Sequence, residues 1–324
     1  MDGLELHVIF GTGPVGQALA QALVQRGKTV KMINRSGRKP AGVPDRVTIG
    51  AGDVSDVNVA KDFARGAAVV YQCTNPPYDQ WPELFPRLQA NTLEAAAKAG
   101  AKYIVADNLY MYGDTDGRPL HEDLPYSAHT KKGKVRAQMA EAVMAAHRSG
   151  KVRVAVARAS DFYGPAALGS VAGERMFGFA VQGRAANVAG DLDRPHTYTY
   201  IEDFGQALAV LGERDETLGQ VWHVPNAETL TTRQFITLIF NELQQPPKMS
   251  ALGRTLLRLG GLFIPVARES IEMLYEFEQP FIVDSSKFTR TFGIQGTPVR
   301  EAIKATVAWY QQRVPNLSQK VWAH

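Results

Sequence analysis

The chain has 324 residues, of which 45% are hydrophobic and 21% charged, so it can bury one large core or two modest ones and lacks the composition of a disordered protein. Its 36 basic and 32 acidic residues give a formal net charge of +4 without a long basic run, which argues against a nucleic-acid partner and favours small anionic ligands. The single cysteine, Cys73, excludes a disulfide within one chain and suits a reducing cytoplasm, where we expect it to be buried.

The beginning of the chain predicts a strand, a glycine-rich turn and a helix. An apolar run over 6–10 leads into the loop Gly11-Thr12-Gly13-Pro14-Val15-Gly16. Apolar residues four apart then predict a helix that stops at Gly27. Such a turn lets the backbone pass close to a pyrophosphate, which the N–H groups and the positive dipole end of the helix can bind. The pattern predicts a dinucleotide site, although glycine spacing alone also occurs in purely structural turns.

The second strand, over 29–33, ends where the ribose-reading residue of such a unit is expected, at Asn34-Arg35-Ser36. An NAD site usually carries Asp or Glu there, whereas a 2′-phosphate calls for a cation and no carboxylate. Here Asn34 is neutral, and Arg35, Arg38 and Lys39 are nearby. Because a guanidinium can grip a phosphate through two hydrogen bonds, we expect NADP, with NAD possible. The alternative is a loop of solvated charges.

A third strand, over 47–51, leads into Gly52-Asp53-Val54. The Asp53 carboxylate can reach the adenine of a bound dinucleotide, or it can cap the helix that follows over 57–64. Further strands are expected over 67–74, 103–108 and 152–160, and helices over 81–99 and 132–149. This alternation predicts an α/β fold with a Rossmann-type, doubly wound parallel sheet.

Ligands bind at the carboxyl ends of the strands in such a sheet, so residues 74–78, 108–113 and 160–165 should line one crevice, with Thr74 at the cofactor and Asn75 at the substrate. Beyond residue 161 the pattern loosens into glycine-rich loops. Strands are then expected over 197–201 and 220–224, and helices over 202–211, 232–243, 252–262, 266–277 and 299–312. These segments predict a smaller, discontinuous C-terminal substrate lobe.

We place the dinucleotide-binding domain at 1–160, with 195–225 returning to it, and the substrate lobe at 161–194 and 226–324. The best membrane candidate, 256–266, is too short and contains Arg258 and Pro265. The acidic start of the chain does not fit a signal peptide. We therefore expect no membrane association.

Several local patterns together resemble the extended branch of the short-chain dehydrogenase/reductases, the NAD-dependent epimerase/dehydratase group, over nearly the full chain. They are the glycine loop, Gly52-Asp53-Val54, Asn91 in Ala90-Asn91-Thr92, Tyr112-Gly113, Arg158-Ala159-Ser160-Asp161-Phe162-Tyr163-Gly164-Pro165 and Tyr200-Ile201-Glu202-Asp203. The resemblance implies a Rossmann cofactor domain, a C-terminal substrate lobe and often a homodimer packed through helices corresponding to 81–99 and 132–149. The apolar stripe of the second helix can equally be plain core.

One departure from the family pattern concerns its catalytic pair, a tyrosine four residues before a lysine. No tyrosine of this chain has a lysine at that spacing. Aligning the helix through Gln138 and Ala142 puts Lys134 in the lysine position and Thr130 in the tyrosine position, and Asn108 replaces the usual Ser or Thr. A threonine hydroxyl donates a hydrogen bond but is not acidic enough to relay a proton near neutral pH. We expect all three to position substrate and ribose, although Lys134 can equally be one solvated cation among several.

Other side chains can supply the missing proton donor. Tyr110, two residues past Asn108, carries a phenol of the right acidity at the predicted crevice and is the best candidate. Tyr126 and His129 can approach the nicotinamide, although an ordinary polar loop is favoured there. Asp107 and Asp161 end neighbouring strands, where each can act on substrate or be a cap or buried hydrogen-bond partner. Substrate contacts are expected from Asn75, Tyr110, Ser160, Asp161 and His196, and the scattered histidines predict no metal site.

The sequence therefore favours an atypical NADP-dependent oxidoreductase that acts on a small carbonyl or hydroxyl compound, cytoplasmic and homodimeric, with Tyr110 as proton donor. Two alternatives stay open. One is a non-catalytic NADP-binding sensor or scaffold. The other is an NAD-dependent nucleotide-sugar epimerase or dehydratase, against which the missing tyrosine counts, because that chemistry needs a base even more than a reductase does.

Overall fold

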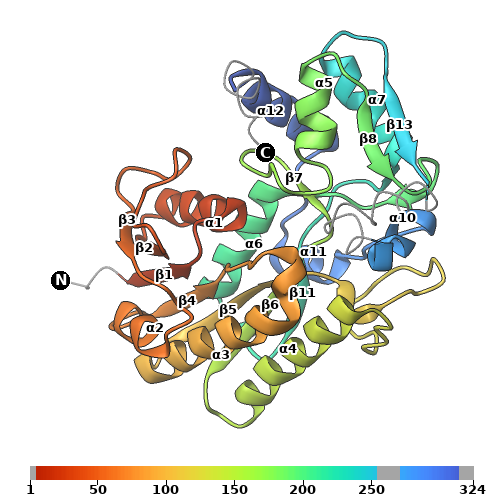
Figure 1. The fold of residues 1–324 in the computed structure, drawn as a ribbon. Coiled ribbons are helices and arrows are strands. Elements are labelled where there is room, and N and C mark those ends of the chain that lie inside the picture. Colours follow the sequence, from red (N-terminus) through yellow and green to blue (C-terminus); the bar gives the residue numbers. More distant parts are fainter. Residues whose placement is uncertain (1–4, 254–270, 314–324) are drawn as a thin grey trace. The chain divides into compact units, whose positions relative to one another are not determined.

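The computed structural model describes residues 5–253 and 271–313, and the chain divides into two compact units (Figure 1). Unit 1 consists of Met1–Gly113, Glu122–Ala159 and Glu202–Val224. Unit 2 consists of Asp114–His121, Ser160–Ile201 and Pro225–His324. This division differs from the expected boundaries in two places, because residues 114–121 and 195–201 both belong to unit 2.

Unit 1 is built on a seven-stranded sheet in the order β11-β6-β5-β4-β1-β2-β3, and every pairing in it is parallel. Its strands are β1 (Leu6–Phe10), β2 (Thr29–Asn34), β3 (Thr48–Ala51), β4 (Val69–Gln72), β5 (Lys102–Asp107), β6 (Arg153–Arg158) and β11 (Val221–His223). Along the chain, β2 and β3 are added on one side of β1, and β4, β5, β6 and β11 are then added on the other side. This is the doubly wound order. The predicted fold class is confirmed. These strands read as apolar runs because a parallel sheet is buried on both faces.

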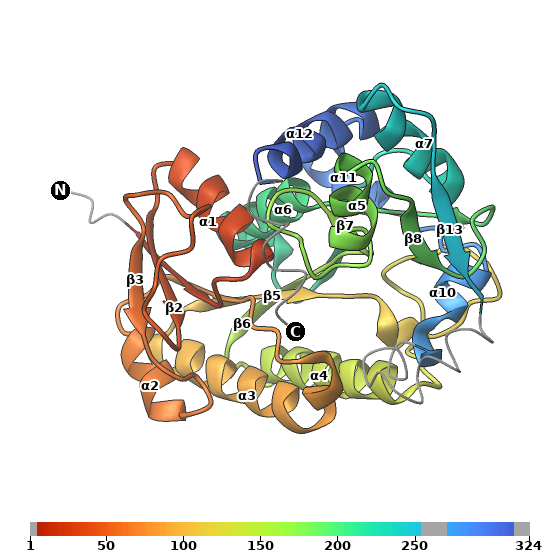
Figure 2. The same cartoon turned by 45° about the horizontal axis from the view of Figure 1, so that its top comes forward.

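Helices cover both faces of this sheet (Figure 2). One face carries α1 (Pro14–Gln25) and α6 (Ile201–Glu213), and the other carries α2 (Val57–Phe63), α3 (Trp81–Ala99) and α4 (Lys131–Arg148). Helices α1 and α6 touch closely, since a Cβ added at Gly205 would lie 2.5 Å from the backbone of Ala18. Short 3-10 turns follow β4 and β5, as η1 (Tyr78–Gln80) and η2 (Tyr110–Tyr112), and another, η4 (Asp215–Thr217), follows α6.

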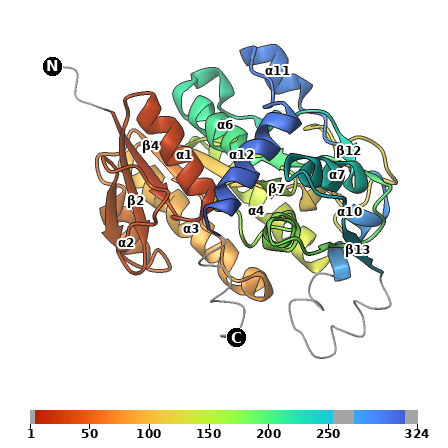
Figure 3. The same ribbon diagram turned by 90° about the horizontal axis from the view of Figure 1, so that it is seen from above.

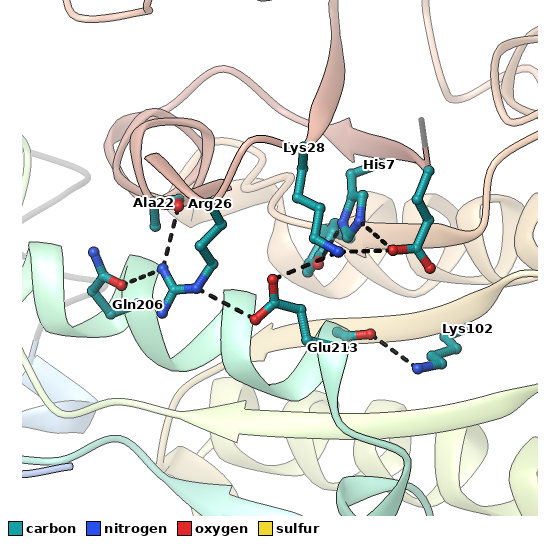
Figure 4. A network of polar contacts seen from close by, with 10 residues as sticks. His7, Ala22, Arg26, Lys28, Lys102, Gln206 and Glu213 are labelled. Carbon is teal, nitrogen blue, oxygen red and sulfur yellow. Dashed lines mark hydrogen bonds and ion pairs between the residues drawn. The ribbon is translucent and has the colours of Figure 1, made fainter. Parts of the chain in front are cut away.

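A polar network fastens the returning helix α6 to the start of the sheet (Figure 4). Arg26, at the end of α1, donates a hydrogen bond to Gln206 Oε1 over 2.5 Å. Its Nε also lies 3.4 Å from a carboxylate oxygen of Glu213, the last residue of α6. Lys28 bridges the carboxylates of Glu213 and Glu5 at 3.7 and 2.9 Å. The network therefore links α1, α6 and the first strands at the end of the sheet opposite the glycine loop.

The buried His7 beside this network gives unit 1 a pH-dependent stability. Burial lowers the pKa of His7 from 6.5 to about 4, against the opposing charge of Glu5. The unfolded chain therefore binds a proton below pH 6.5 that the folded chain binds only near pH 4, so we expect the free energy of unfolding to fall as the pH drops through this window. Urea denaturation at pH 7 and pH 5 should show a smaller loss for His7→Gln than for the wild type; equal losses would contradict the assignment.

Unit 2 has a core of its own between helices and short strands. Its helical segments are a π-helical turn (Glu174–Gly178), α5 (Phe179–Val181), α7 (Thr232–Glu242), η5 (Ile271–Met273), α10 (Tyr275–Glu278), α11 (Ser286–Phe292) and α12 (Val299–Gln311). Aromatic and aliphatic residues of α7, α12 and the π-helical turn pack together, with α7 and α12 side by side (Figure 3). A capping box between Thr231 and Gln234 fixes the start of α7.

The strands of unit 2 come in three small pairs. They are β7 (Phe162–Tyr163) with β10 (Thr199–Tyr200), β9 (Pro195–His196) with β12 (Leu230–Thr231), and β8 (Ala186–Ala189) with β13 (Met249–Leu252). Of the strand predicted over 197–201, only β10 forms, and β9 lies just before it. The loops predicted over 161–194 contain β7, β8, the π-helical turn and α5. Most of the helix predicted over 252–262, the membrane candidate 256–266 and the first part of the helix predicted over 266–277 lie outside the described residues.

Candidate functional site

The three glycines of the first loop have three different surroundings. Gly11 has φ +110°, and a Cβ there would lie 2.5 Å from the carbonyl oxygen of Cys73. A Cβ at Gly16 would lie 2.3 Å from the carbonyl oxygen of Gly11. Gly13, in contrast, has no heavy atom within 4 Å of its Cβ position. Two glycines are therefore required by the fold, and the third leaves open space above the N-terminus of α1, where a pyrophosphate can approach the backbone.

Side chains hold this loop in place. Gln17 Nε2 donates to the carbonyl oxygen of Thr12 over 3.0 Å, and Asn34 Nδ2 donates to Thr12 Oγ1 over 3.0 Å. Pro14 is the first residue of α1, where its missing N–H costs nothing and its fixed φ suits the helix. Val15 is half-buried in the first turn. The loop at the end of β1 is therefore preorganised by contacts within unit 1.

The loop after β2 is ordered by Asn34 and presents two cations. Besides Thr12, Asn34 Nδ2 reaches the carbonyl oxygen of Arg38 over 2.8 Å, and Asn34 Oδ1 accepts from the backbone N–H and hydroxyl of Ser36, each over 3.1 Å. Lys39 is committed to the carbonyl oxygens of Pro44 and Asp45. Arg35 and Arg38 are exposed, and neither guanidinium forms an ion pair or hydrogen bond with a described side chain. Asn34 is thus structural, and the two arginines are available to an anion.

Asp53 does not cap the helix that follows it, which excludes one of its two predicted roles. The N-cap of α2 is Asp56, whose side chain accepts from the backbone N–H of Asn58. Asp53 accepts instead from the backbone N–H of Ser55 over 2.9 Å, and this hydrogen bond lowers the pKa of Asp53. Asp53 is exposed, while Val54 is buried. An adenine contact from the ionised Asp53 carboxylate stays a prediction.

The residues after β4 and β5 lie at the same edge of the sheet as the glycine loop, because the three strands are parallel neighbours. Thr74 Oγ1 accepts from Gln72 Nε2 over 3.0 Å, and Asn75 is exposed. Asn108 Oδ1 accepts from the backbone N–H of Tyr110 over 3.3 Å and so closes the turn η2. Tyr110 is half-buried, with its ring centre 5.9 Å from that of Trp81.

The start of α4 is fixed by its N-cap. Thr130 is the N-cap, with its Oγ1 accepting from the backbone N–H of Gly133 over 3.0 Å, and it is buried. Lys134 is exposed. The pair four residues apart that faces the interior is Lys132 and Arg136. The Lys132 ammonium lies 4.4 Å from the centre of the Tyr78 ring, in a cation–π contact.

A buried ionic group at the ends of β5 and β6 was not anticipated. Asp107 pairs with Arg136 through Oδ1 and lies 3.4 Å from Arg158 Nε through Oδ2. Arg158 is 0% exposed and donates to the hydroxyl oxygens of Tyr112 over 2.6 Å and of Tyr126 over 2.5 Å. Burial opposes the charge of Arg158, but Tyr112 and Asp107 outweigh it and raise the pKa of Arg158. An arginine at the end of an otherwise apolar strand was the sequence signal for this group.

Tyr112 lies between Arg158 and His223. Arginine can only donate hydrogen bonds, so the Tyr112 oxygen accepts from Arg158, and the same hydroxyl forms a hydrogen bond with His223 Nε2, 3.0 Å away. The burial of Tyr112 raises its pKa, which keeps this phenol protonated. Burial likewise raises the pKa of Cys73 to about 12, so its thiol stays protonated near neutral pH, in agreement with a structural role.

The remaining predicted substrate residues gather in unit 2. Ser160 Oγ donates to the carbonyl oxygen of Thr197 over 2.5 Å. His196 Nε2 lies 3.0 Å from Asp161 Oδ2, and His196 Nδ1 lies 3.1 Å from the carbonyl oxygen of Glu276. Burial and the charge of Asp161 raise the pKa of Glu276 well above its ordinary value. Asp161 and His196 are therefore brought together, beside a Glu276 that sequence reasoning missed.

The chain belongs to the NAD dependent epimerase/dehydratase family, whose sequence profile matches residues 8–224. Among curated proteins it is similar to dTDP-glucose 4,6-dehydratase of Streptomyces griseus, with 23% identity over 228 residues. That match covers 68% of this chain and 62% of the dehydratase, so the chain spans less than two thirds of that relative's length.

Solved structures show the same fold at low sequence identity. An epimerase from Methanothermobacter thermautotrophicus superposes with a TM-score of 0.79 and 18% identity, covering 98% of this chain and 95% of the epimerase. UDP-glucose 4-epimerase of Thermus thermophilus, solved with NAD, superposes with a TM-score of 0.75 and 16% identity, covering 94% of this chain and 99% of that enzyme.

No helix within residues 5–253 and 271–313 has the length and apolar character needed to cross a membrane. Nor do three or more His, Cys, Asp or Glu side chains of that part of the chain gather into a group that could hold a metal ion.

Proposed function

We propose that this protein is an NADP-dependent oxidoreductase acting on a small carbonyl or hydroxyl compound. The observation that carries the proposal is the open space at Gly13, between two glycines that the fold encloses. A dinucleotide bound there would meet Gly11, Thr12, Gly13 and the N-terminus of α1 with its pyrophosphate. Lys134 stays our proposal for the nicotinamide ribose, and Asp53, Val54 and Thr74 for further cofactor contacts.

The choice of NADP over NAD rests on the loop after β2. It offers Arg35 and Arg38 to a 2′-phosphate, and its first part, residues 34–38, contains no carboxylate to accept hydrogen bonds from a ribose 2′-hydroxyl. Asn34, at the usual position of that carboxylate, already uses its side chain within the loop. A cytoplasmic homodimer packed through α3 and α4 remains part of the proposal.

The cofactor supplies a hydride to the substrate carbon, so the protein must supply a proton to the substrate oxygen. Asn108 and Thr130 can position the substrate, but both use their polar side-chain atoms in turns and caps. The candidates for the proton are two half-buried phenols, Tyr110 from the sequence and Tyr126 from its contact with Arg158. Asn75, Ser160, Asp161 and His196 stay the proposed substrate contacts.

A panel assay tests the proposed function. NADPH binding is followed by nicotinamide fluorescence, and NADPH consumption by absorbance, across small aldehydes, small ketones and nucleotide sugars. We expect tight binding and net consumption with at least one aldehyde or ketone. Tight binding without turnover of any compound would instead favour the non-catalytic sensor or scaffold.

A nucleotide-sugar epimerase or dehydratase is the second candidate, and the relatives named above favour it. Such enzymes restore their cofactor within each cycle, so this candidate predicts conversion of a nucleotide sugar with no net NADPH or NADH consumption. The same panel therefore separates the two candidates when sugar products are followed alongside absorbance.

A further inference from the structure

We infer that Tyr126, held by Arg158, is the proton donor of the reaction, in place of the tyrosine and lysine pair that the chain lacks. The inference rests on the proposed function and deepens it by naming one of the two candidate phenols. It starts from hydrogen-bond geometry: Arg158 Nη2 donates to the Tyr126 hydroxyl oxygen over 2.5 Å. Because a guanidinium has no acceptor, the Tyr126 proton points elsewhere, and it is donated to no described residue.

The buried group beside Tyr126 contains more guanidinium groups than carboxylates. Arg136 and Arg158 are 3% and 0% exposed, and they share one carboxylate, that of Asp107. Two guanidinium groups and one carboxylate leave this group with an excess positive charge next to the phenol oxygens. That excess is unusual, because buried charges are normally paired. Glu122 accepts a hydrogen bond from the backbone N–H of His223 and forms no ion pair with either guanidinium.

Tyr112 shows why Tyr126 is the phenol that can act. Both rings lie 4.9 Å from the Arg158 guanidinium carbon, and both hydroxyls accept from it. Tyr112 is buried and its hydroxyl also forms a hydrogen bond with His223, so it stays in place as structure. Tyr126 is half-buried on the loop before α4, so part of this residue faces solvent.

One proton passes from Tyr126 to the substrate oxygen in the proposed reaction. Hydride addition forms a C–H bond and breaks the carbonyl π bond, which leaves an electron pair on the substrate oxygen. The Tyr126 O–H bond breaks and its proton goes to that oxygen, giving an alcohol. The electron pair stays on the phenol oxygen, where the Arg158 hydrogen bond holds it, until solvent returns a proton. Arg158 is thus a positioning residue, and Tyr126 is the group that touches substrate.

Turnover of matched variants tests the inference. Tyr126→Phe should lower kcat about 10²-fold to 10⁴-fold, the usual contribution of a general acid, with NADPH affinity unchanged. Tyr112→Phe, the matched control, should keep kcat within a few-fold of the wild type at a lower Tm. A loss confined to Tyr110→Phe overturns the inference alone, whereas a wild type that oxidises no NADPH overturns the proposed function.

A double variant tests the role of Arg158. Arg158→Lys keeps the charge but not the fork that spans two phenols, so it should lower kcat with NADPH affinity unchanged. Because Arg158 acts through Tyr126, adding Arg158→Lys to Tyr126→Phe should lower kcat little further. A merely structural loss would add in full to that of Tyr126→Phe, and such additivity overturns the inference.

Discussion

Gly13→Val should weaken NADPH binding about 100-fold, a loss of roughly 2.7 kcal/mol, without unfolding the protein. The backbone at Gly13 has φ −68° and ψ −179°, which any residue adopts, and its Cβ position is free of protein atoms. The added Cβ therefore has no protein atom within 4 Å, and the side chain enters the space where the pyrophosphate would lie. Fluorescence titration with NADPH measures the affinity, and thermal unfolding without ligand measures the stability.

Gly16→Ala is the matched control, since it changes a glycine of the same loop that is enclosed by protein. Its Cβ would lie 2.3 Å from the carbonyl oxygen of Gly11 and 3.2 Å from Met32 Cε. Overpacking of this kind costs about 1–3 kcal/mol, so the ligand-free Tm should fall. Unchanged NADPH affinity in a folded Gly13→Val protein would contradict the assignment of the loop as a dinucleotide site.

The double variant Arg35→Ala/Arg38→Ala should lose most of its preference for NADPH. Each guanidinium that no longer meets the 2′-phosphate removes a charge-assisted hydrogen bond, and two such losses together predict a roughly 100-fold weaker NADPH complex. NADH lacks that phosphate, so its affinity should change little. Paired titrations with NADPH and NADH give the ratio directly.

Lys39→Ala supplies the control within the same loop. Its ammonium is already bound to the carbonyl oxygens of Pro44 and Asp45, so its removal should change the NADPH to NADH ratio little. Equal losses from all three cations would indicate a diffuse electrostatic effect. An unchanged ratio in the arginine double variant would remove these residues from cofactor recognition and reopen the case for NAD.

The Rossmann sheet could be predicted because each of its signals is local. An apolar strand, a glycine turn and an amphipathic helix follow one another within 6–27, and the pattern repeats along the chain. The small strand pairs of unit 2 were largely missed, because two-residue strands such as β7 and β12 carry no periodicity and exist through their distant partners.

The site was predicted less fully for a similar reason. The register of α4 depends on Thr130 being the N-cap, which turns Lys132 and Arg136 inward and leaves Lys134 exposed. A threonine directly before a helix is a sequence signal for an N-cap. The alignment of Thr130 and Lys134 with the family's tyrosine and lysine drew attention to catalysis instead. The contact of Arg158 with Tyr126 joins residues 32 positions apart and could not be read from spacing.

Transfer of deuterium tests the central claim most directly. Two samples of NADPH are prepared, each deuterated at C4 of the nicotinamide on one of its two faces. Each is incubated with the protein and pooled small aldehydes and ketones, and the masses of the products are measured by mass spectrometry. The proposed oxidoreductase predicts an alcohol one mass unit heavier from one of the two labelled cofactors, and no such alcohol with Gly13→Val. Recovery of every carbonyl compound unlabelled, by a protein that binds NADPH tightly, would contradict it.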